Sequence, residues 1–413
     1  MPNKLSDVPI LLASVAEGVV LSLLYSYGPL YMWQALAAPS LTQAALSVGL
    51  ASFAAFVTAG IWGRWGDRFG RKEALIGVGM LLSSGGLAAL SLVRNVHLFL
   101  ALAVLTVTGI AAGAPLGVAW LTLRAPDRPG AAAARYYRAR TLGWTLGSYA
   151  AGYIVQQLNM QGLIHIFRAG AGLCLLAAML LFVMALGQHN RQPSYRKVGN
   201  PAAADDNTAK PSLPQVTGTA VWRQPLVPAV LVAVLLSFGG NEAFMALMGP
   251  YLTDYLHGSA AWVGYAVGTA SFLGIFVIGR IGKLADRRGP GTVFTLGTYG
   301  YALMFLLMTL LRYPSITLML FTIPLYPFIS TGVTGLMVRY VPAAQRGEAI
   351  GVYEGTASLA TSLGSMAGGV AADVCGLWVT PVFSLLLSGV GALTAWLGVL
   401  RIIRKTAVAS TTT

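Results

Sequence analysis

Three glutamates stand within long apolar stretches of this sequence: Glu17, Glu242 and Glu354. An uncompensated charge near the centre of a lipid bilayer costs at least about 2.5 kcal/mol, so embedded acids usually face a cavity and often serve function. A carboxyl group held in such a place could exchange protons or bind the cationic group of a small molecule. The three positions are therefore the first candidates for a functional site.

Glu17 is the leading candidate among them. It lies about nine residues into the first apolar stretch, which at 1.5 Å per residue is roughly 13 Å and close to the bilayer midplane. We expect Glu17 to couple proton movement or to bind a cationic group. The alternative is a structural carboxyl group that is hydrogen-bonded to a neighbouring helix.

Glu242 follows Asn241 in the segment SFGGNEAF. This pair could offer an acceptor and a donor to a solute, or it could bridge two helices. Tyr25 and Tyr27 lie deeper in the first apolar stretch than the aromatic residues expected at the membrane interface. We therefore add both tyrosines to the residues that could line a cavity.

Glu354 is expected near the cytoplasmic end of its apolar stretch. There a gate contact, or an ion pair with Arg135, Arg138 or Arg140, competes with a role in proton coupling. Arg168 is the sole cation deep in an apolar stretch, roughly 10 Å from its outer end by helical rise, so its side chain could reach the interface. A contact with solute is the alternative for Arg168.

The composition indicates what positions these residues. The chain has 413 residues, of which 56% are hydrophobic and 10% charged, and a mean hydropathy of +0.69, far from soluble domains. Lipid offers no hydrogen-bond partner to exposed backbone N–H and C=O groups, so each membrane span should be a helix. The apolar runs also lack the alternation of apolar and polar residues that a β-barrel requires. An all-α polytopic membrane protein is therefore expected. The net charge of +14 does not indicate nucleic-acid binding, because the basic residues lie in short connectors.

Apolar windows between charged or turn-rich breaks predict twelve transmembrane helices. The first six cover residues 8–35, 42–62, 73–93, 97–122, 140–158 and 162–187. The second six cover residues 225–256, 261–281, 291–311, 314–338, 348–373 and 377–401. We expect an N-terminal six-helix bundle at 1–187, a cytoplasmic linker of little fixed structure at 188–224, and a C-terminal six-helix bundle at 225–413.

The basic residues predict the orientation. With the N-terminus in the cytoplasm, 24 of the 27 lysines and arginines fall in segments on that side of the membrane. The positive-inside rule therefore favours both termini in the cytoplasm. We expect an integral protein of the bacterial inner membrane.

One connector carries an unusual density of charge. The segment GRWGDRFGRK, Gly63–Lys72, holds five ionisable residues, and its spacing of Gly, Asp, Arg and Gly returns 219 residues later at Gly282–Gly289. GPLY at 28 and GPYL at 249 are 221 residues apart, and TLGSYAAGY at 145 and SLGSMAGGV at 362 are 217 apart. Such similar offsets indicate an internal duplication.

The charged connector resembles the hallmark G-x-x-x-D-R-x-G-R-[RK] of the major facilitator superfamily. It matches this pattern at every defined position, through Gly63, Asp67, Arg68, Gly70, Arg71 and Lys72. The second copy keeps Asp286 and Arg287. The resemblance implies a fold of two pseudo-symmetric six-helix bundles, with helices one, four, seven and ten lining a central cavity.

The resemblance also implies a conformational latch formed by these residues. Asp67 would contact the start of the eleventh helix, near Arg346–Ala349, when the cytoplasmic side is closed, because a carboxylate is favoured at a helix N-terminus. The alternative is that the charges of the connector only set the topology. The chain departs from many drug exporters of the family, since no arginine lies between His97 and Arg124.

The function that the resemblance implies is secondary active transport of a small organic solute by alternating access, with export by proton antiport as the preferred direction. Proton-coupled import of a sugar, a nucleoside or a metal chelate such as a siderophore is the main alternative. A channel or a membrane sensor on the same fold is an alternative of another class. The expected partners are a small-molecule substrate, protons and the lipid bilayer, and the expected state is a monomer.

An enzyme is not expected. The sequence contains no G-x-S-x-G, H-E-x-x-H or complete G-x-x-x-x-G-K-[ST] motif, the patterns that mark common hydrolases, metalloproteases and nucleotide-binding loops. The four histidines are dispersed, and Cys174 and Cys375 lack the spacing of metal ligands. We therefore expect no cofactor and no metal. Gly143, Gly147 and Gly152 in the fifth helix keep a small-residue spacing that permits close helix approach.

Overall fold

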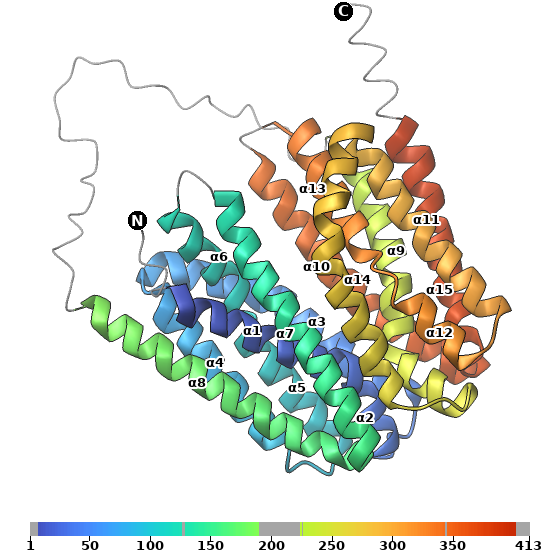
Figure 1. The fold of residues 1–413 in the computed structure, drawn as a ribbon, viewed down its shortest axis with the longest axis horizontal. Helices are drawn as coiled ribbons and strands as arrows, with labels where there is room; N and C mark the ends of the chain where they lie inside the picture. Colours follow the sequence, from blue (N-terminus) through green and yellow to red (C-terminus); the bar gives the residue numbers. More distant parts are fainter. Residues whose placement is uncertain (1–6, 126–128, 190–223, 225, 343–344, 402–413) are drawn as a thin grey trace, which may run out of the picture.

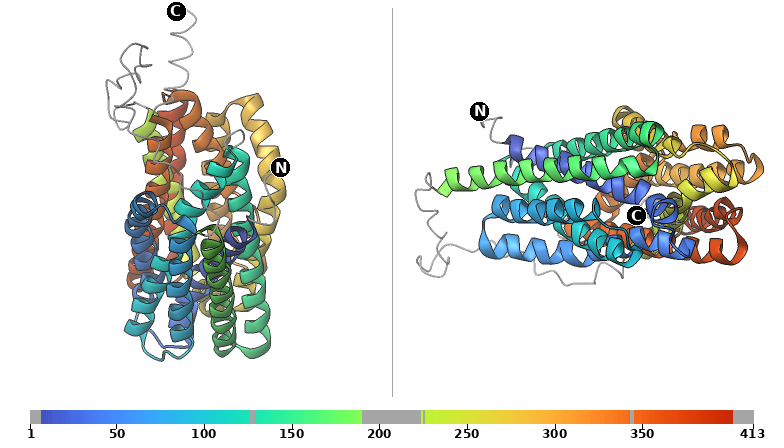
Figure 2. Two further views of the ribbon diagram at one scale, coloured as in Figure 1. Left: turned by 90° about the vertical axis from the view of Figure 1, so that its left-hand side faces the viewer. Right: turned by 90° about the horizontal axis from the view of Figure 1, so that it is seen from below.

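The computed structural model describes residues 7–125, 129–189, 224, 226–342 and 345–401 (Figure 1). These residues form helices joined by short turns, with no strand among them. The helices pack side by side in two groups (Figures 1 and 2). The predicted linker 188–224 lies outside the described residues except for Gln188, His189 and Gln224.

The first group contains α1 (Val8–Ser22), η2 (Leu23–Tyr27), α2 (Gly28–Gln34), α3 (Leu41–Phe69), α4 (Lys72–Leu90), α5 (Val96–Ile110), α6 (Gly113–Arg124), α7 (Pro129–Leu158), η3 (Met160–Gly162) and α8 (Leu163–His189). The second group contains α9 (Leu226–Pro250), η6 (Tyr251–Tyr255), α10 (Ala261–Arg288), α11 (Pro290–Leu310), α12 (Pro314–Phe321), α13 (Tyr326–Tyr340), α14 (Arg346–Cys375), α15 (Val379–Thr394) and η8 (Ala395–Leu400).

Every predicted span corresponds to one helix or to consecutive helical segments. Ten such stretches among the described residues are long and apolar enough to cross a membrane. The other two predicted spans correspond to α7 and α14, each 30 residues long. These two helices are less continuously apolar than the other ten stretches. Each packs against one helix of its own group and one of the other, α7 against α1 and α10, and α14 against α9 and α3. The prediction of an all-α polytopic membrane protein is confirmed.

The segments predicted as charged loops after the second and eighth spans are largely helical. Both spans therefore end later than the predicted residues 62 and 281. α3 continues to Phe69 and α10 to Arg288, so the connector after α3 consists of Gly70 and Arg71. Gly70 has φ +67° and Gly289 has φ +87°. Glycine adopts positive φ without the steric cost of a side chain, so it ends a helix readily.

The fifth helix also begins earlier than predicted. α7 starts at Pro129 rather than near residue 140. Proline suits the first turn of a helix, and the alanines at 131–134 have the highest helix propensity. As a result Arg135, Arg138 and Arg140 lie on a helix and not in a connector.

Two spans are interrupted. The turn at Ala111 and Ala112 separates α5 from α6, and residues 322–325 separate α12 from α13. Pro324 lies in the second break, because proline cannot donate the backbone hydrogen bond that a continuous helix needs there.

Glycines set how closely the helices of the first group approach. A Cβ atom on Gly143 would lie 2.0 Å from the Val15 carbonyl oxygen, and one on Gly147 would lie 2.2 Å from Ser22 Oγ. A Cβ on Gly152 would lie 2.9 Å from the Ala261 carbonyl oxygen of the other group. The predicted close approach at these three glycines is therefore confirmed.

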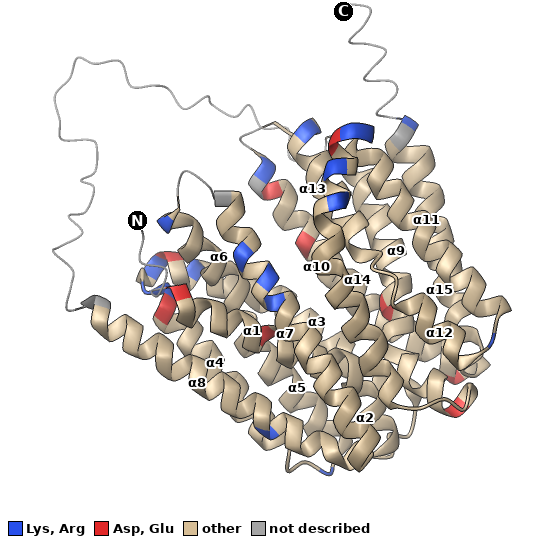
Figure 3. Cartoon of the chain, viewed as in Figure 1, with Lys and Arg blue, Asp and Glu red and all other residues tan. Residues whose placement is uncertain are grey.

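The two groups meet at one end of the molecule and diverge toward the other (Figure 1). At the first end, Trp33 Nε1 donates to Asp254 Oδ2 at 2.5 Å, and Gln34 Nε2 donates to Thr253 Oγ1 at 2.9 Å. We call this the contact end. Lys and Arg residues on α6, α7, α10 and α13 gather toward the opposite end of the molecule (Figure 3). We call this the basic end.

Candidate functional site

Glu17 lies in a polar cage formed by three helices. Its residue exposure is 3%. Tyr136 on α7 donates its hydroxyl to Oε2 of Glu17 at 2.5 Å, and Nε of Arg140 lies 3.3 Å from Oε1. Tyr136 and Arg140 are four residues apart, so they share one face of α7. From α6, Gly113 leaves room for the carboxylate, since a Cβ there would lie 2.7 Å from Oε2.

The cage depends on close contact between α1 and α7. A Cβ on Gly18 would lie 2.0 Å from the Arg140 carbonyl oxygen, so only glycine fits at that position without a shift of the backbone. Ser14 Oγ donates to the Tyr136 carbonyl oxygen at 2.8 Å, one turn before Glu17. The backbone of α1 therefore places Glu17 opposite the Tyr136 and Arg140 side chains.

Arg140 stands between Glu17 and accessible space. The side chain of Arg140 is 32% exposed, whereas that of Glu17 is 4% exposed. A solute that enters from that space would meet the guanidinium group first, and the carboxylate behind it. A guanidinium group has five N–H donors, so Arg140 could donate to a solute while it is paired with Glu17.

The second helix group presents an acid and a tyrosine toward Arg140. Glu354 on α14 is exposed and lies within electrostatic range of Arg140. Tyr326 on α13 is 47% exposed, lies within the same range of Arg140 and is hydrogen-bonded to Tyr353 on α14. Tyr137, the neighbour of Tyr136, is in electrostatic range of Glu354. Polar groups of both helix groups thus surround the space in front of Arg140.

The ion pair that was one alternative for Glu354 is not formed among the described residues of this structure. Arg140 pairs with Glu17, and Nη1 of Arg135 pairs with Asp7 at 2.8 Å. Arg138 Nε donates to the Ala134 carbonyl oxygen of its own helix at 3.2 Å. The arginines of α7 lie in the first group, and the groups diverge toward the basic end.

Glu242 lies on the other side of the same region. Its residue exposure is 8%, and Asn241 Nδ2 donates to its Oε1 at 3.0 Å. Tyr25 is in electrostatic range of both Glu242 and Glu17. Its hydroxyl accepts a hydrogen bond from Ser52 Oγ at 3.0 Å, and its ring meets Trp144 edge-on with centroids 6.1 Å apart. The structure therefore brings Tyr25 near both of these embedded glutamates.

Tyr27 and Arg168 lie away from this region. Tyr27 is fully buried, and its hydroxyl accepts the backbone N–H of Gly264 at 2.9 Å. It joins η2 to α10 and lines no open space in this conformation. Arg168 is exposed on α8 and its Nε donates to Ser91 Oγ at 3.3 Å, a contact at the edge of the first group.

Asp67 of the predicted latch is bound within its own helix group in this structure. Asp67 pairs with Nζ of Lys72 at 3.1 Å, and the Asp67 side chain is 85% exposed. Asp286 and Arg287 are exposed in the last turn of α10. The two groups diverge at the basic end (Figure 1), so the contact expected between Asp67 and Arg346–Ala349 is not seen in this structure and stays a prediction.

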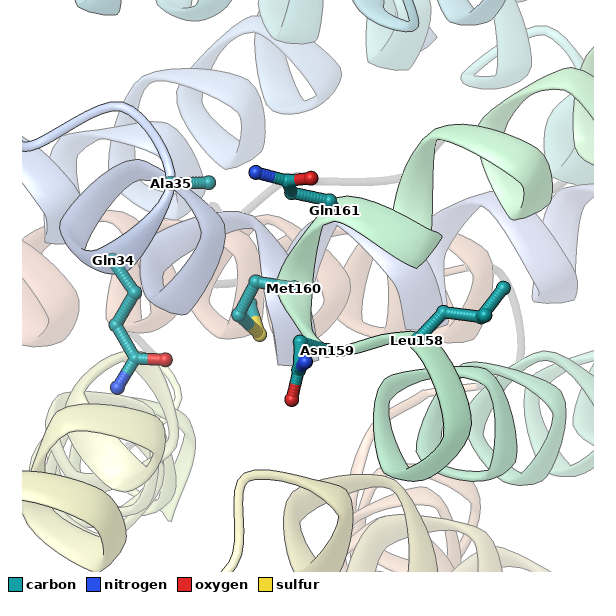
Figure 4. Close-up of a pocket in the computed structure, with 6 residues that line it drawn as sticks. All are labelled: Gln34, Ala35, Leu158, Asn159, Met160 and Gln161. Atoms are coloured by element: carbon teal, nitrogen blue, oxygen red, sulfur yellow. The ribbon is translucent and has the colours of Figure 1, made fainter.

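A surface hollow of about 440 Å³ lies at the contact end (Figure 4). It is lined by Gln34, Ala35, Leu158, Asn159, Met160 and Gln161. These residues come from the end of α2 and from the turn between α7 and α8. None of the residues singled out from the sequence lines this hollow, so it is separate from the glutamate region.

Sequence reasoning missed Tyr136 and Tyr326 as parts of the site, and it considered Arg140 as a partner of Glu354 and not of Glu17. A usable signal existed for Tyr136 and Arg140, because a helix that begins at Pro129 places residues 136 and 140 on one face. Tyr326 follows the helix break at residues 322–325, and its position depends on the packing of α13 against its neighbours.

Comparisons with known proteins agree with this architecture. The family model described as "Major Facilitator Superfamily" matches residues 10–365. A protein of Deinococcus radiodurans named "Putative sugar efflux transporter" is 27% identical over 347 residues, which cover 81% of this chain and 82% of that protein.

Solved structures of transporters share the fold. A bacterial homolog of the human lysosomal transporter Spinster, in an inward-facing and unoccupied conformation, has a TM-score of 0.73 at 15% identity, covering 97% of each chain. The nucleoside transporter NupG has a TM-score of 0.72 at 13% identity, covering 95% of this chain and 97% of the other. The xylose transporter XylE from E. coli, in an inward open conformation, has a TM-score of 0.66 at 17% identity, covering 95% and 94%.

Proposed function

Because this chain belongs to the Major Facilitator Superfamily, whose members are transporters and not enzymes, we propose that it moves a small organic solute across the membrane by alternating access. The observation that carries the proposal is the paired carboxylate of Glu17. It is buried at the contact of α1 and α7, and its partner Arg140 faces accessible space between the helix groups.

In this proposal the two helix groups, at 1–187 and 225–413, rock against each other about the region of Glu17. The positive-inside rule supports a cytoplasmic basic end, which would give an inward-open conformation here and both termini in the cytoplasm of a bacterial inner membrane. The hydrogen bonds at the contact end would then close the outer side.

We assign the solute to the class of small hydroxylated molecules, sugars and their glycosides. Rings of Tyr25, Trp144 and Tyr326 offer apolar surface near Arg140 and Glu354, which offer hydrogen bonds. Ligand sites commonly combine apolar walls with a few placed polar groups. The name of the Deinococcus relative supports both this class and the outward direction. Import of a pentose or a nucleoside is the second candidate, because XylE and NupG share the fold.

We further propose that Glu17 exchanges the coupling proton. When Glu17 is ionised, it holds Arg140 in place, and the exposed part of the guanidinium group would donate to the solute. When Glu17 is protonated, this attraction is lost, and Arg140 would move into the space that the solute occupies. Proton and solute would thereby exclude each other, as antiport requires. A membrane potential of 100 mV adds about 2.3 kcal/mol per charge moved, which is enough to bias such a cycle.

The test is solute flux in proteoliposomes that contain the purified full-length chain. A library of sugars, glycosides and nucleosides is loaded on one side, with and without a pH gradient. We expect saturable flux of a hydroxylated solute, trans-stimulation by the same solute, and export driven by inward proton movement. Flux that neither saturates nor shows trans-stimulation would favour a channel, and the absence of flux for the whole library would favour a sensor.

A further inference from the structure

An aspartate of the second helix group caps a helix of the first at the contact end. Asp373 lies in the last turn of α14. Its Oδ1 accepts the backbone N–H of Leu41 at 2.7 Å, and its Oδ2 accepts the backbone N–H of Thr42 at 3.0 Å and the Thr42 hydroxyl at 2.5 Å. Leu41 and Thr42 are the first two residues of α3. The first N–H groups of a helix have no partner within it, and the macrodipole favours a carboxylate there.

The first backbone N–H groups of α3 find their acceptors partly in the first helix group and partly in the second. Ser40 Oγ, within the first group, accepts the N–H of Gln43 at 3.1 Å. The two earlier N–H groups depend on Asp373, which reaches them only when the end of α14 lies beside the start of α3. Gly369, one turn before Asp373, permits that approach, since a Cβ there would lie 2.8 Å from the Thr42 Cα.

The same two helices carry a matching aspartate at the other end. α3 and α14 run in opposite directions, so each helix ends beside the start of the other. Asp67 lies two residues before the last residue of α3, as Asp373 lies two residues before the last residue of α14. In this structure Asp373 holds the start of α3, while Asp67 is exposed and bound to Lys72.

The repeat-related helix pair closes the contact end without a carboxylate. At the 217-residue offset of the repeat, the residue equivalent to Asp373 is Gln156 on α7. Its Oε1 accepts the Tyr265 hydroxyl of α10 at 2.5 Å. Of these two equivalent helix pairs, α3 and α14 are the pair in which a carboxylate of one group caps a helix of the other.

We propose that Asp373 is a latch of the contact end that alternates with Asp67 at the basic end. This inference rests on the proposed alternating access. Opening the contact end breaks all three bonds of Asp373 and leaves two N–H groups of α3 to water. Closing the basic end brings Asp67 to the start of α14. The two aspartates thus stabilise opposite conformations through one pair of helices.

The test measures both ends of the full-length chain by pulsed electron paramagnetic resonance. Cys174 and Cys375 are replaced by serine. Spin labels are placed on exposed residues, at Leu92→Cys with Leu311→Cys for the contact end and at Leu123→Cys with Val338→Cys for the basic end. Asp373→Asn is compared with the unsubstituted Asp373 in this background.

We expect Asp373→Asn to raise the ratio of contact-end-open to contact-end-closed molecules by about tenfold, because hydrogen bonds to a charged group are the strong ones. Asp67→Asn should shift the ratio in the opposite direction, and the double variant should lie between the two. Asn95→Ala is the matched control: the Asn95 side chain caps α5 at the same end but within its own group, so the ratio should not change.

Two outcomes would overturn the latch. One is two populations whose ratio does not respond to Asp373→Asn, and the other is an equal shift in Asn95→Ala, which would indicate general weakening of helix ends. A single population at both label pairs in every variant would instead contradict alternating access itself. The failure of the latch and the failure of the proposed function are therefore distinguishable.

Discussion

The guanidinium group of Arg140 lies 3.3 Å from the carboxylate of Glu17, and this pair joins α7 to α1 inside the membrane. The carboxylate is buried and also receives the Tyr136 hydroxyl, so both of its oxygens have partners. Ion pairs buried in this way are weak evidence for stability, because desolvation of the two charges offsets their attraction. The pair is better explained by a role in which its two members separate and rejoin.

Glu17→Gln should abolish solute flux driven by a pH gradient and leave the protein folded. Glutamine keeps the shape of the side chain and an acceptor for Tyr136, but it cannot exchange a proton. The measurement is flux in proteoliposomes with an imposed gradient. Exchange of solute for solute without a gradient should fall as well, because the neutral side chain no longer holds Arg140 in place, and cooperative unfolding of the purified variant serves as the control. Unchanged gradient-driven flux would remove Glu17 from the coupling role.

Arg140→Gln should destabilise the protein more than the double variant with Glu17→Gln. The single change leaves a buried carboxylate without its ion-pair partner, which we expect to cost roughly 3 kcal/mol, the lower part of the usual range because Arg140 is partly exposed. The double variant leaves no charge behind. Unfolding temperatures of the purified proteins give the ranking, and an Arg140→Gln variant as stable as the parent would contradict the pairing.

Gly143→Ala should push α1 away from α7. The added Cβ would meet the Val15 carbonyl oxygen at 2.0 Å, and overpacking of this kind costs about 1 to 3 kcal/mol. Transport should fall as well, because the displacement separates Glu17 from Arg140. Gly172→Ala is the matched control, since a Cβ on Gly172 has nothing within 4 Å. Equal unfolding temperatures for the two variants would argue against the close packing.

Glu354→Gln should weaken solute binding while gradient-driven transport persists at high solute concentration. Glu354 faces the space in front of Arg140 from the second helix group, so we assign it to the solute and not to the proton. Loss of a charged hydrogen-bond acceptor should raise the half-saturating concentration about tenfold or more. If instead transport loses its dependence on the pH gradient at unchanged half-saturation, Glu354 belongs to the coupling step.

Much of the fold could be predicted from the sequence. Apolar length and the positions of charge are sufficient for the spans, because lipid imposes the length of a crossing helix and charged residues mark the breaks between helices. The predicted start of α7 is too late, because a cluster of charges is typical of a connector between membrane spans. The arginines of α7 are tolerated because this helix faces the other helix group and accessible space. That location depends on how the helices pack, and the local sequence does not show it.

The candidate site could be predicted only in part. Glu17, Glu242 and Glu354 were found because an acid in an apolar run is conspicuous by itself. The partners of Glu17 lie more than a hundred residues away on α7, and no local pattern connects them to α1. Tyr27 illustrates the reverse case, since its depth suggested a cavity residue while its hydroxyl binds Gly264 across the two groups.

The hydrogen bond from Trp33 to Asp254 joins equivalent positions of the internal repeat. These residues are 221 positions apart, the offset that separates GPLY from GPYL, so they occupy the same place in the two copies. In two identical halves that place would set aspartate against aspartate or tryptophan against tryptophan. A tryptophan donor facing an aspartate acceptor requires copies that differ here, so the two halves of this chain are complementary and not interchangeable.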